Sequence, residues 1–477
     1  MKPTLSKTDF IQFLNCPKSL WLLKNKPELY PVEEFTEYAK KLTAEGDEVE
    51  RHVKLLIDLQ EDANSYFFQT VFDTNDGLFA RADMVLKNPD GSIDLFEIKS
   101  STSVKETNPH NQLKDAAFQS IAAQRTGAVV RKFFIVHLNG DYIRDGDVNA
   151  DELLVFSDVT EKVNAVLSET EEEIVDVLSL LAKEKIDESS CSCLHLSRGH
   201  HCNSFGYFNP QLPKPSIYNL PRLSVSKRKL FVGEGRFDLG DIKLDEVSRL
   251  QKPVLLSYQS GAPYVDLPDI KNFFEELSYP LYFLDYETYA SAIPIVSGAK
   301  PQSPIPFQFS LHRLDLDGEL THSEFLAENP EMPLNLVTVL EQSIGEIGSI
   351  ITWNRSFENT QNKMMATLYP EYGRFLKSVI ERTVDLQDVF KTGYVDIRFK
   401  GSTSIKKVLP VCVPELSYEG MDISDGTEAM QGWITMLELP RGQEKNDKHR
   451  ALLEYCKLDT NGMVSLFEFA QRLAMDA

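Results

Sequence analysis

Acidic residues follow an apolar segment of this chain at a spacing that suits metal-ion chemistry. Asp285 and Glu287 come directly after Leu281–Leu284 in "LYFLDYETYA". Because side chains two residues apart lie on one face of a strand, both carboxylates are expected to point the same way. Tyr455 and Asp459, in "LLEYCKLDTNGM", are four residues apart and therefore share one face of a predicted helix.

Two further acids lie near predicted strand ends in the same half of the chain. Glu358 lies in "TWNRSFEN" and Asp385 in "RTVDLQDVF", where Asp385 is interpreted as a helper or substitute ligand. Four carboxylates brought together repel one another unless cations lie between them. Two divalent ions ~3.5–4 Å apart use such a set to bind the attacking and leaving oxygens of phosphoryl transfer. Oxygen-only ligands favour Mg²⁺ or Mn²⁺. The alternative is that the acids end a strand in solvent.

The order D-x-E, N-x-x-F-E and Y-x-x-x-D resembles the DnaQ-like exonucleases of the DEDDy subgroup, which have the RNase H fold. Glu358 stands where that family has an aspartate. The resemblance implies four metal ligands and a tyrosine that orients the attacking water: Asp285, Glu287, Glu358, Asp459 and Tyr455. In "GSTSIKKVLP" we expect Ser402, Ser404 and Lys406 to contact the substrate backbone, with a solvated turn as the alternative.

A second set of acids lies in the first half of the chain, on two strands predicted around the turn "NPDG". Asp83 lies on the first strand, and Glu97 and Lys99 share a face of the second. One acid from each strand can bind a metal, while the lysine orients water or offsets phosphate charge. The next helix carries Asp115 and Gln119 four residues apart.

This second set resembles the PD-(D/E)XK nucleases of the RecB-like type, in particular the CRISPR-associated RecB-like exonucleases. The resemblance implies a metal site and two catalytic side chains, namely Glu50, Asp83 and Glu97 with Lys99 and Gln119. Ala82 rather than proline precedes Asp83, and an acid stands at position 50 instead of histidine, with His52 as the weaker option. The alternative for E-x-K is a solvated strand.

Four of the six cysteines form a pattern that suggests a metal site. They are Cys16, Cys191, Cys193 and Cys202, whereas Cys412 and Cys456 stand alone. A cytosolic setting disfavours disulfides. The RecB-like relatives carry a four-cysteine iron–sulfur staple, which implies a 4Fe–4S cluster here. Zinc is one alternative, since three histidines lie nearby at positions 195, 200 and 201. The other alternative is that the cysteines are buried and bind no metal.

The order of the helices and strands expected around these residues predicts an α/β fold with two nuclease-like domains. We expect a restriction-endonuclease-like core over residues 1–210, a helical connector over 211–275, and an RNase H-like mixed sheet with flanking helices over 276–477. Ser6 is a predicted helix N-cap, Pro17 is expected to open the next helix, and Gly46 is expected to interrupt a long helical pattern. Asp317-Gly318 predicts a hairpin turn.

Composition limits the function further. The net charge of −22 over 477 residues disfavours nucleic-acid binding by bulk electrostatics but is compatible with acidic sites that hold cations. We expect a cytosolic protein without a membrane span or signal peptide. The order of motifs resembles a bacterial fusion of the two nuclease types, which implies a metal-dependent nuclease acting on DNA in repair or phage defence. The alternative is a nucleic-acid-binding or assembly protein with partly decayed sites; the sequence identifies no protein partner.

Overall fold

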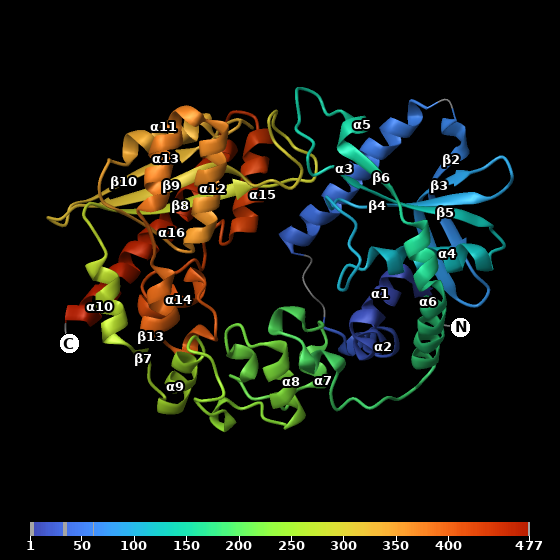
Figure 1. The fold of residues 1–477 in the computed structure, drawn as a ribbon, viewed down its shortest axis with the longest axis horizontal. Coiled ribbons are helices and arrows are strands. Elements are labelled where there is room, and N and C mark those ends of the chain that lie inside the picture. The colour runs from blue at the N-terminus through green and yellow to red at the C-terminus, as the bar shows by residue number, and fades with distance from the viewer. Residues whose placement is uncertain (1–3, 32–35, 61, 476–477) are drawn as a thin grey trace. The chain divides into compact units, whose positions relative to one another are not determined.

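The computed structural model describes residues 4–31, 36–60 and 62–475. The chain divides into two compact units (Figure 1). Unit 1 contains residues 1–211 and 291–302, and unit 2 contains residues 212–290 and 303–477. The connector expected over residues 211–275 is therefore not a separate unit, because residues 212–275 are part of unit 2. Among the described helices, none is both long and apolar enough to cross a bilayer.

Unit 1 is built on a mixed sheet whose described strands follow the order β1-β3-β4-β5-β6, with β2 also paired to β3. The pairs β1–β3 and β4–β5 are parallel, and the other pairs are antiparallel. The strands are β1 (Leu5–Ser6), β2 (Tyr66–Asp73), β3 (Leu78–Lys87), β4 (Ile93–Ile98), β5 (Val130–Leu138) and β6 (Leu154–Asp158).

Helices cover both faces of this sheet. One core cluster joins α1, α4 and α6 to β3, β4 and β5, and a second joins α3 to β4, β5 and β6 (Figure 1). The helices are α1 (Lys7–Asn15), α2 (Pro17–Asn25), α3 (Glu37–Asp58), α4 (Gln112–Arg125), α5 (Ala150–Leu153), α6 (Thr160–Leu181) and α7 (Phe205–Phe208).

Local sequence signals correctly predicted where two helices of unit 1 begin. Ser6 and Asp9 form the expected capping box, and Pro17 is the first residue of α2. The expected break at Gly46 is wrong, because α3 runs through it from Glu37 to Asp58. A glycine inside a helix costs only about 1 kcal/mol, and the buried apolar face of α3, which includes Val49 and Val53, outweighs that cost.

Unit 2 contains a second mixed sheet with the described order β10-β9-β8-β11-β12. Its strands β8, β11 and β12 are mutually parallel, so their carboxyl ends meet at one edge. Strand β9 is antiparallel to β8, and β10 is antiparallel to β9. The strands are β8 (Leu281–Tyr289), β9 (Ile305–Leu314), β10 (Leu320–Leu326), β11 (Ser349–Thr352) and β12 (Thr383–Asp385). A short separate pair joins β7 (Tyr264–Val265) to β13 (Tyr394–Val395).

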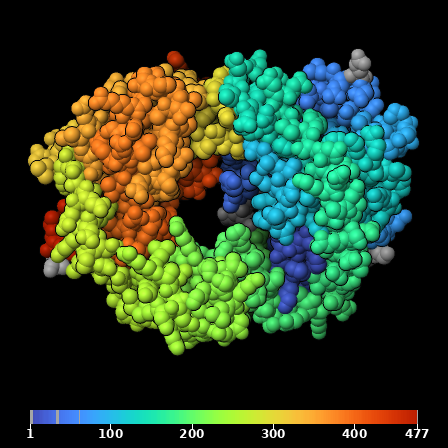
Figure 2. All heavy atoms as spheres, viewed as in Figure 1, coloured from blue at the N-terminus to red at the C-terminus, as the bar shows by residue number. Residues whose placement is uncertain are grey.

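The helices of unit 2 lie on both faces of the sheet and beyond its edge. They are α8 (Val225–Gly233), α9 (Lys252–Ser260), α10 (Leu267–Glu275), α11 (Leu334–Ser343), α12 (Arg355–Leu368), α13 (Gly373–Glu381), α14 (Ile405–Cys412), α15 (Gly426–Glu438) and α16 (Gln443–Met475). In the space-filling view the orange atoms of α11, α12 and α13 cover one face (Figure 2). The long helix α16 packs on β8 and β9.

Strand β8 is central and faces two different environments. Tyr282, Leu284 and Tyr286 pack in the core with α11, α12 and α13. Phe283 points the other way, toward Phe467 of α16, with ring centroids 5.5 Å apart. Since side chains alternate along a strand, Asp285 and Glu287 are on the α16 side. The double-sided burial explains why the start of β8 is apolar without alternation.

Gly348 allows β11 to begin directly beside the residues that precede β8. Its φ is +97°, and an added Cβ would lie 2.1 Å from the carbonyl oxygen of Pro280. Gly318, in the turn between β9 and β10, is a suitable comparison for Gly348. Its φ is also positive, at +90°, but no atom lies within 4 Å of an added Cβ. Both positions require a left-handed backbone, but only Gly348 also requires the missing side chain.

We predict that Gly348→Ala lowers the free energy of unfolding of unit 2 more than Gly318→Ala does. Both variants pay the strain of a positive φ, and Gly348→Ala additionally costs about 1–3 kcal/mol because the backbone must shift to remove the overlap. Denaturant titration of both variants measures the difference. Equal losses would show that the close approach of Gly348 to Pro280 does not constrain the sheet.

Candidate metal centres

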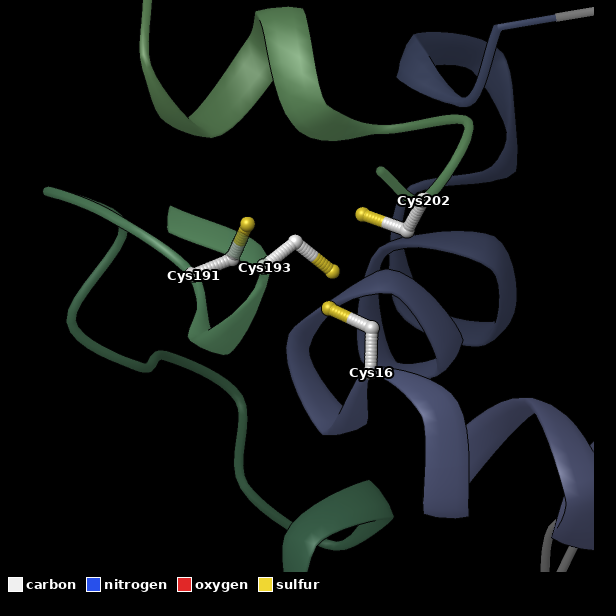
Figure 3. Close-up of side chains that lie close together, drawn as sticks. All are labelled: Cys16, Cys191, Cys193 and Cys202. Carbon is white, nitrogen blue, oxygen red and sulfur yellow. The ribbon is translucent and has the colours of Figure 1, made fainter. Parts of the chain in front are cut away.

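The four cysteines of the predicted metal site lie close together in unit 1. Their sulfur atoms all lie within 4.8 Å of one another. Figure 3 shows Cys16 between α1 and α2, and Cys191 and Cys193 close together in the segment after α6. Cys202 lies in the loop before α7, and the four sulfurs face a common space. Thiols in this arrangement fit a metal ion or metal cluster as ligands. The identity of the metal is not fixed by this geometry.

Hydrogen bonds near the cysteines join the start of the chain to later residues, and the Ser19 and Ser204 hydroxyl oxygens lie 3.2 Å apart. The Trp21 indole donates a hydrogen bond of 2.8 Å to the carbonyl oxygen of Lys183, and the Asn209 side-chain amide lies 3.5 Å from the Cys191 sulfur. A cavity of about 540 Å³ is lined by Cys16, Cys193 and Cys202. Among the described residues, no histidine joins the cysteine group.

Two acids predicted in the first half lie on neighbouring strands, with Asp83 in the middle of β3 and Glu97 near the end of β4. One oxygen of Asp83 accepts the backbone N–H of Ile98 at 2.8 Å. Lys99 donates to Glu97 at 2.6 Å and to Asp115 at 3.1 Å, so the two members of E-x-K share a face as expected. Gln119 of α4 donates to the second oxygen of Glu97.

A lysine from α1 completes this group and was not identified from the sequence. The ammonium of Lys7 pairs with the same Glu97 oxygen that Lys99 contacts. Ninety residues separate Lys7 from Glu97, and no local pattern indicates the contact. Glu50 lies apart, because it pairs with Lys54 at 2.8 Å and accepts a hydrogen bond from Gln69 at 2.9 Å. The acids of unit 1 do not include three ligand atoms within 4.8 Å of one another among the described residues.

Charge balance in this acidic site depends on the two lysines. Burial opposes ionisation of Glu97, but Lys7 and Lys99 hold the pKa of Glu97 below its usual range. Burial, with the nearby charge of Glu97, raises the pKa of Asp83 to about 7. Burial also raises the pKa of Asp115. The two lysines therefore stabilise the ionised form of Glu97.

Three acids predicted in the second half meet in unit 2. Ligand atoms of Asp285, Glu287 and Asp459 all lie within 4.8 Å of one another. Asp285 and Glu287 come from β8, and Asp459 comes from α16 on the same side of the sheet. The Tyr418 hydroxyl donates to Asp459 at 2.6 Å, and the Cys456 sulfur lies 3.8 Å from an Asp285 oxygen. Neither neighbour had been singled out from the sequence as part of this site.

Lys406 is the cation beside this carboxylate group. Its ammonium donates to the Tyr455 hydroxyl at 3.1 Å and lies 5.0 Å from the centre of the Tyr455 ring. Lys406 lies in α14, and the two serines predicted with it precede that helix, with Ser404 at its N-cap. Ser402 lines a cavity of about 290 Å³ together with Arg222 and Lys391, and its hydroxyl accepts the backbone N–H of Ser404.

Glu358 and Asp385 differ in their hydrogen bonding. Glu358 is 2% exposed, and one of its oxygens has no hydrogen-bond partner, although it lies outside the group of three acids. Asp385 accepts the backbone N–H groups of Asn354, Arg355 and Gln387 at 3.1–3.2 Å. Asp385 therefore anchors the start of α12, the helix that carries Glu358.

Burial makes ionisation of the unit 2 acids costly. It raises the pKa of Asp285 and of Glu287 well above their usual values, with mutual repulsion as the next cause. It raises the pKa of Glu358 to about 9 and that of Asp459 to about 6. A group of this kind gains stability either by binding protons or by binding cations.

Comparisons with known proteins give relatives without a described activity. Residues 282–404 match a family model described as a domain of unknown function, DUF2779. "Uncharacterized protein MG366" of Mycoplasma genitalium is 27% identical over 224 residues, and its Mycoplasma pneumoniae homologue is 26% identical over 220. These matches cover 43% and 41% of this chain but only about a third of each relative, 34% and 33%. A solved structure titled "Crystal structure of SSO0001" is 15% identical with a TM-score of 0.24, covering 39% of this chain and 88% of that chain.

We predict that unit 2 loses thermal stability as pH rises when no divalent ion is present. The pKa of Asp459 is higher in the folded chain, about 6, than the usual carboxyl value near 3.8. Its neutral form therefore contributes stability at low pH, and this contribution is lost as pH rises through about 6. The melting temperature, measured from pH 5 to pH 8 with and without Mg²⁺, should fall less when Mg²⁺ is present.

Two variants test the source of this pH dependence. Asp459→Asn cannot ionise and should flatten the profile in metal-free buffer. Asp396→Asn is the matched control, because Asp396 is also buried but pairs with Arg398, which holds its pKa below the usual value. An identical slope in Asp459→Asn and the unchanged protein would contradict the assignment.

Proposed function

We propose that the chain is a metal-dependent nuclease that hydrolyses phosphodiester bonds of nucleic acid, with DNA as the preferred substrate and a candidate site in each unit. The proposal includes an RNase H-like exonuclease fold for unit 2 and a PD-(D/E)XK core for unit 1. DNA repair or phage defence in the cytoplasm is the proposed setting. The observation that carries the proposal is the cluster of Asp285, Glu287 and Asp459 within 4.8 Å.

The charge of this cluster favours divalent ions as its ligands. The described residues contribute one ammonium, Lys406, whose contacts are Tyr455 and the backbone of Ser424. Burial opposes ionisation of all three acids, and repulsion between the carboxylates adds to this for Asp285 and Glu287. Mg²⁺ or Mn²⁺ bound there would offset this repulsion and supply charge stabilisation to the transferring phosphoryl group.

The protein's own side chains would orient the reactants around that centre. Tyr455 is held by Lys406 and faces the acids, which suits a hydroxyl that positions the attacking water. Tyr418 holds Asp459 through a 2.6 Å hydrogen bond. Glu358, buried with an unpaired oxygen, is the proposed fourth ligand.

Unit 1 offers a second candidate site next to an open groove. A cavity of about 560 Å³ is lined by Lys99 and Asp115, and also by Tyr38 and Lys105. Lys99 would offset charge on a phosphate, while Gln119 holds Glu97 in place. Tyr38, which is 53% exposed, offers a ring on which a base can stack.

The cysteines are proposed to hold a 4Fe–4S cluster, with zinc as the alternative. The C-x-C spacing and the resemblance to RecB-like nucleases favour the cluster. The close approach of the four sulfurs favours zinc, because a tetrahedral ion with ~2.3 Å bonds brings its sulfur ligands to roughly 4 Å from one another, and the observed limit is 4.8 Å.

A nucleic-acid-binding or assembly protein is the second candidate function. It is favoured by the position of Glu358 outside the group of three acids and by the absence of a comparable group of three acids among the described residues of unit 1. Binding without cleavage would still use the basic residues beside each site, such as Lys105 and Lys406.

We predict that the protein degrades end-labelled DNA only when Mg²⁺ or Mn²⁺ is present. Lys99→Ala should remove the contribution of unit 1, and Asp285→Asn that of unit 2, each by about 10²-fold or more because these residues act on the reacting groups. The double variant should be inactive on single- and double-stranded DNA and on RNA.

Asp317→Asn, in the exposed turn between β9 and β10, is the control and should cleave normally. If the unchanged protein binds DNA in a gel-shift experiment but cleaves none of the substrates with either metal, the binding function is correct. If Asp285→Asn and Lys99→Ala together leave cleavage intact, the assigned residues are wrong.

We predict that Cys202→Ser loses the metal of the cysteine site, whereas Cys412→Ser, a change in unit 2, retains it. Elemental analysis and absorbance of anaerobically purified protein measure this. Iron with sulfide and broad absorbance near ~400 nm identifies the cluster, and one zinc per chain without iron identifies zinc. Unchanged protein without either metal would contradict both assignments.

A further inference from the structure

Helix α1 joins the two candidate metal sites of unit 1. Lys7, its first residue, pairs with Glu97 in the acidic site. Cys16, which directly follows its last residue, is one of the four clustered cysteines. Nine helical residues span only about 13 Å, so a single short helix separates the two groups.

The first end of α1 is fixed in the acidic site. Strand β1 pairs with the start of β3, and the helix begins immediately after it. Ser6 and Asp9 form a reciprocal capping box, with the Ser6 backbone N–H donating to Asp9 at 2.9 Å. This end of the helix therefore brings the Lys7 ammonium to Glu97 from an element separate from β4, which Lys99 directly follows.

The middle of α1 packs on the helix that supplies the other polar groups of the acidic site. The fully buried ring of Phe10 stacks on Phe118 of α4, with centroids 5.3 Å apart. Phe118 precedes Gln119, whose amide holds Glu97, and α4 also carries Asp115. A displacement of α1 along its axis would disturb this stacking.

The second end of α1 is fixed by Cys16. Its backbone N–H donates to the carbonyl oxygen of Gln12 at 2.8 Å, and its own carbonyl accepts the N–H of Ser19 at 3.1 Å. The residue thus ends α1 and begins α2, and its side chain is fully buried among the cysteines. A metal bound by the four thiols would hold this junction to the segment 191–202.

We propose that Lys7 is a positioning residue of the acidic site in unit 1, and that α1 couples its position to the metal centre of the four cysteines. This inference rests on the metal-binding roles proposed above for both groups. The Lys7 ammonium and a divalent ion are both cations that bind Glu97, so they compete. The cysteine centre fixes α1, favours the Lys7–Glu97 ion pair, and thereby lowers the affinity of the acidic site for divalent ions.

The coupling must act in both directions. If the cysteine centre lowers the affinity of the acids for a divalent ion, that ion must weaken the cysteine centre by the same factor. Regulation of the nuclease site therefore follows from the structure of α1: loss of the cysteine centre releases Lys7 and increases metal loading at Glu97.

The first experiment measures Mn²⁺ binding to the full-length chain by titration calorimetry, in an Asp285→Asn background that disables the unit 2 site. Lys7→Met should tighten Mn²⁺ binding about tenfold, the effect of removing one charged hydrogen-bond partner from Glu97. Lys132→Met is the control, because Lys132 pairs with Asp158 at 3.2 Å on the half-exposed surface of the same unit. A purely structural role for Lys7 would leave the affinity unchanged or weaken it.

The second experiment measures the rate at which iodoacetamide modifies Cys16 and Cys202, read by mass spectrometry on the same proteins. Mn²⁺ should accelerate modification several-fold with Lys7 present, and should have no effect in Lys7→Met. Cys412, in unit 2, is the internal control for reagent and folding.

The inference is overturned if Mn²⁺ leaves the modification rate unchanged, or if it changes the rate equally with and without Lys7. It is also overturned if Lys7→Met does not tighten Mn²⁺ binding. Neither measurement uses nucleic acid, so a protein that shows the coupling but cleaves nothing would contradict only the proposed nuclease function. A protein that cleaves DNA without the coupling would contradict only this inference.

Discussion

The free-energy cost of removing carboxylates from water governs both acidic sites of this chain. An isolated buried carboxylate is so unfavourable that it must gain a cation or a proton. In unit 1 the protein provides cations, because Lys7 and Lys99 both contact Glu97. In unit 2 it provides mainly hydroxyl groups and one more distant ammonium, and the pKa values of Asp285 and Glu287 rise accordingly. The elements around each site hold groups together that would otherwise separate.

The arrangement of the strands explains how such groups are assembled. In unit 2 the parallel strands β8, β11 and β12 end at one edge, where Asp285 ends the apolar part of β8 and Asp385 ends β12. Asp385 anchors α12 by accepting three backbone N–H groups. In unit 1 the antiparallel strands β3 and β4 bring Asp83 beside the backbone of Ile98. Asp285, Glu287 and Glu97 all lie on paired strands, opposite Ser310, Gln308 and Ile135, so the sheets themselves fix the positions of these acids.

The sequence was informative where a local rule applied. Strand alternation predicted that Asp285 and Glu287 face the same way, and helical spacing brought Tyr455 and Asp459 to one face. It was not informative where the partner is distant in sequence, as Lys7 is from Glu97 and Tyr418 is from Asp459. Glu50 had the right residue type in a predicted helix, but its partners, Gln69 on β2 and Lys54, could not be inferred from spacing alone.

If the two acidic sites bind metal ions as proposed, the two ways of balancing charge would give them different metal affinities. A divalent ion entering the unit 1 site must share Glu97 with ammonium groups, and Lys99 stays charged because Glu97 and Asp115 raise its pKa despite burial. Its affinity there is limited by fixed positive charge. An ion entering the unit 2 site instead displaces protons from acids with raised pKa values, so its binding releases protons and strengthens as pH rises. If both sites bind divalent ions as proposed, metal loading of unit 2 would depend on pH, whereas loading of unit 1 would depend on the position of Lys7.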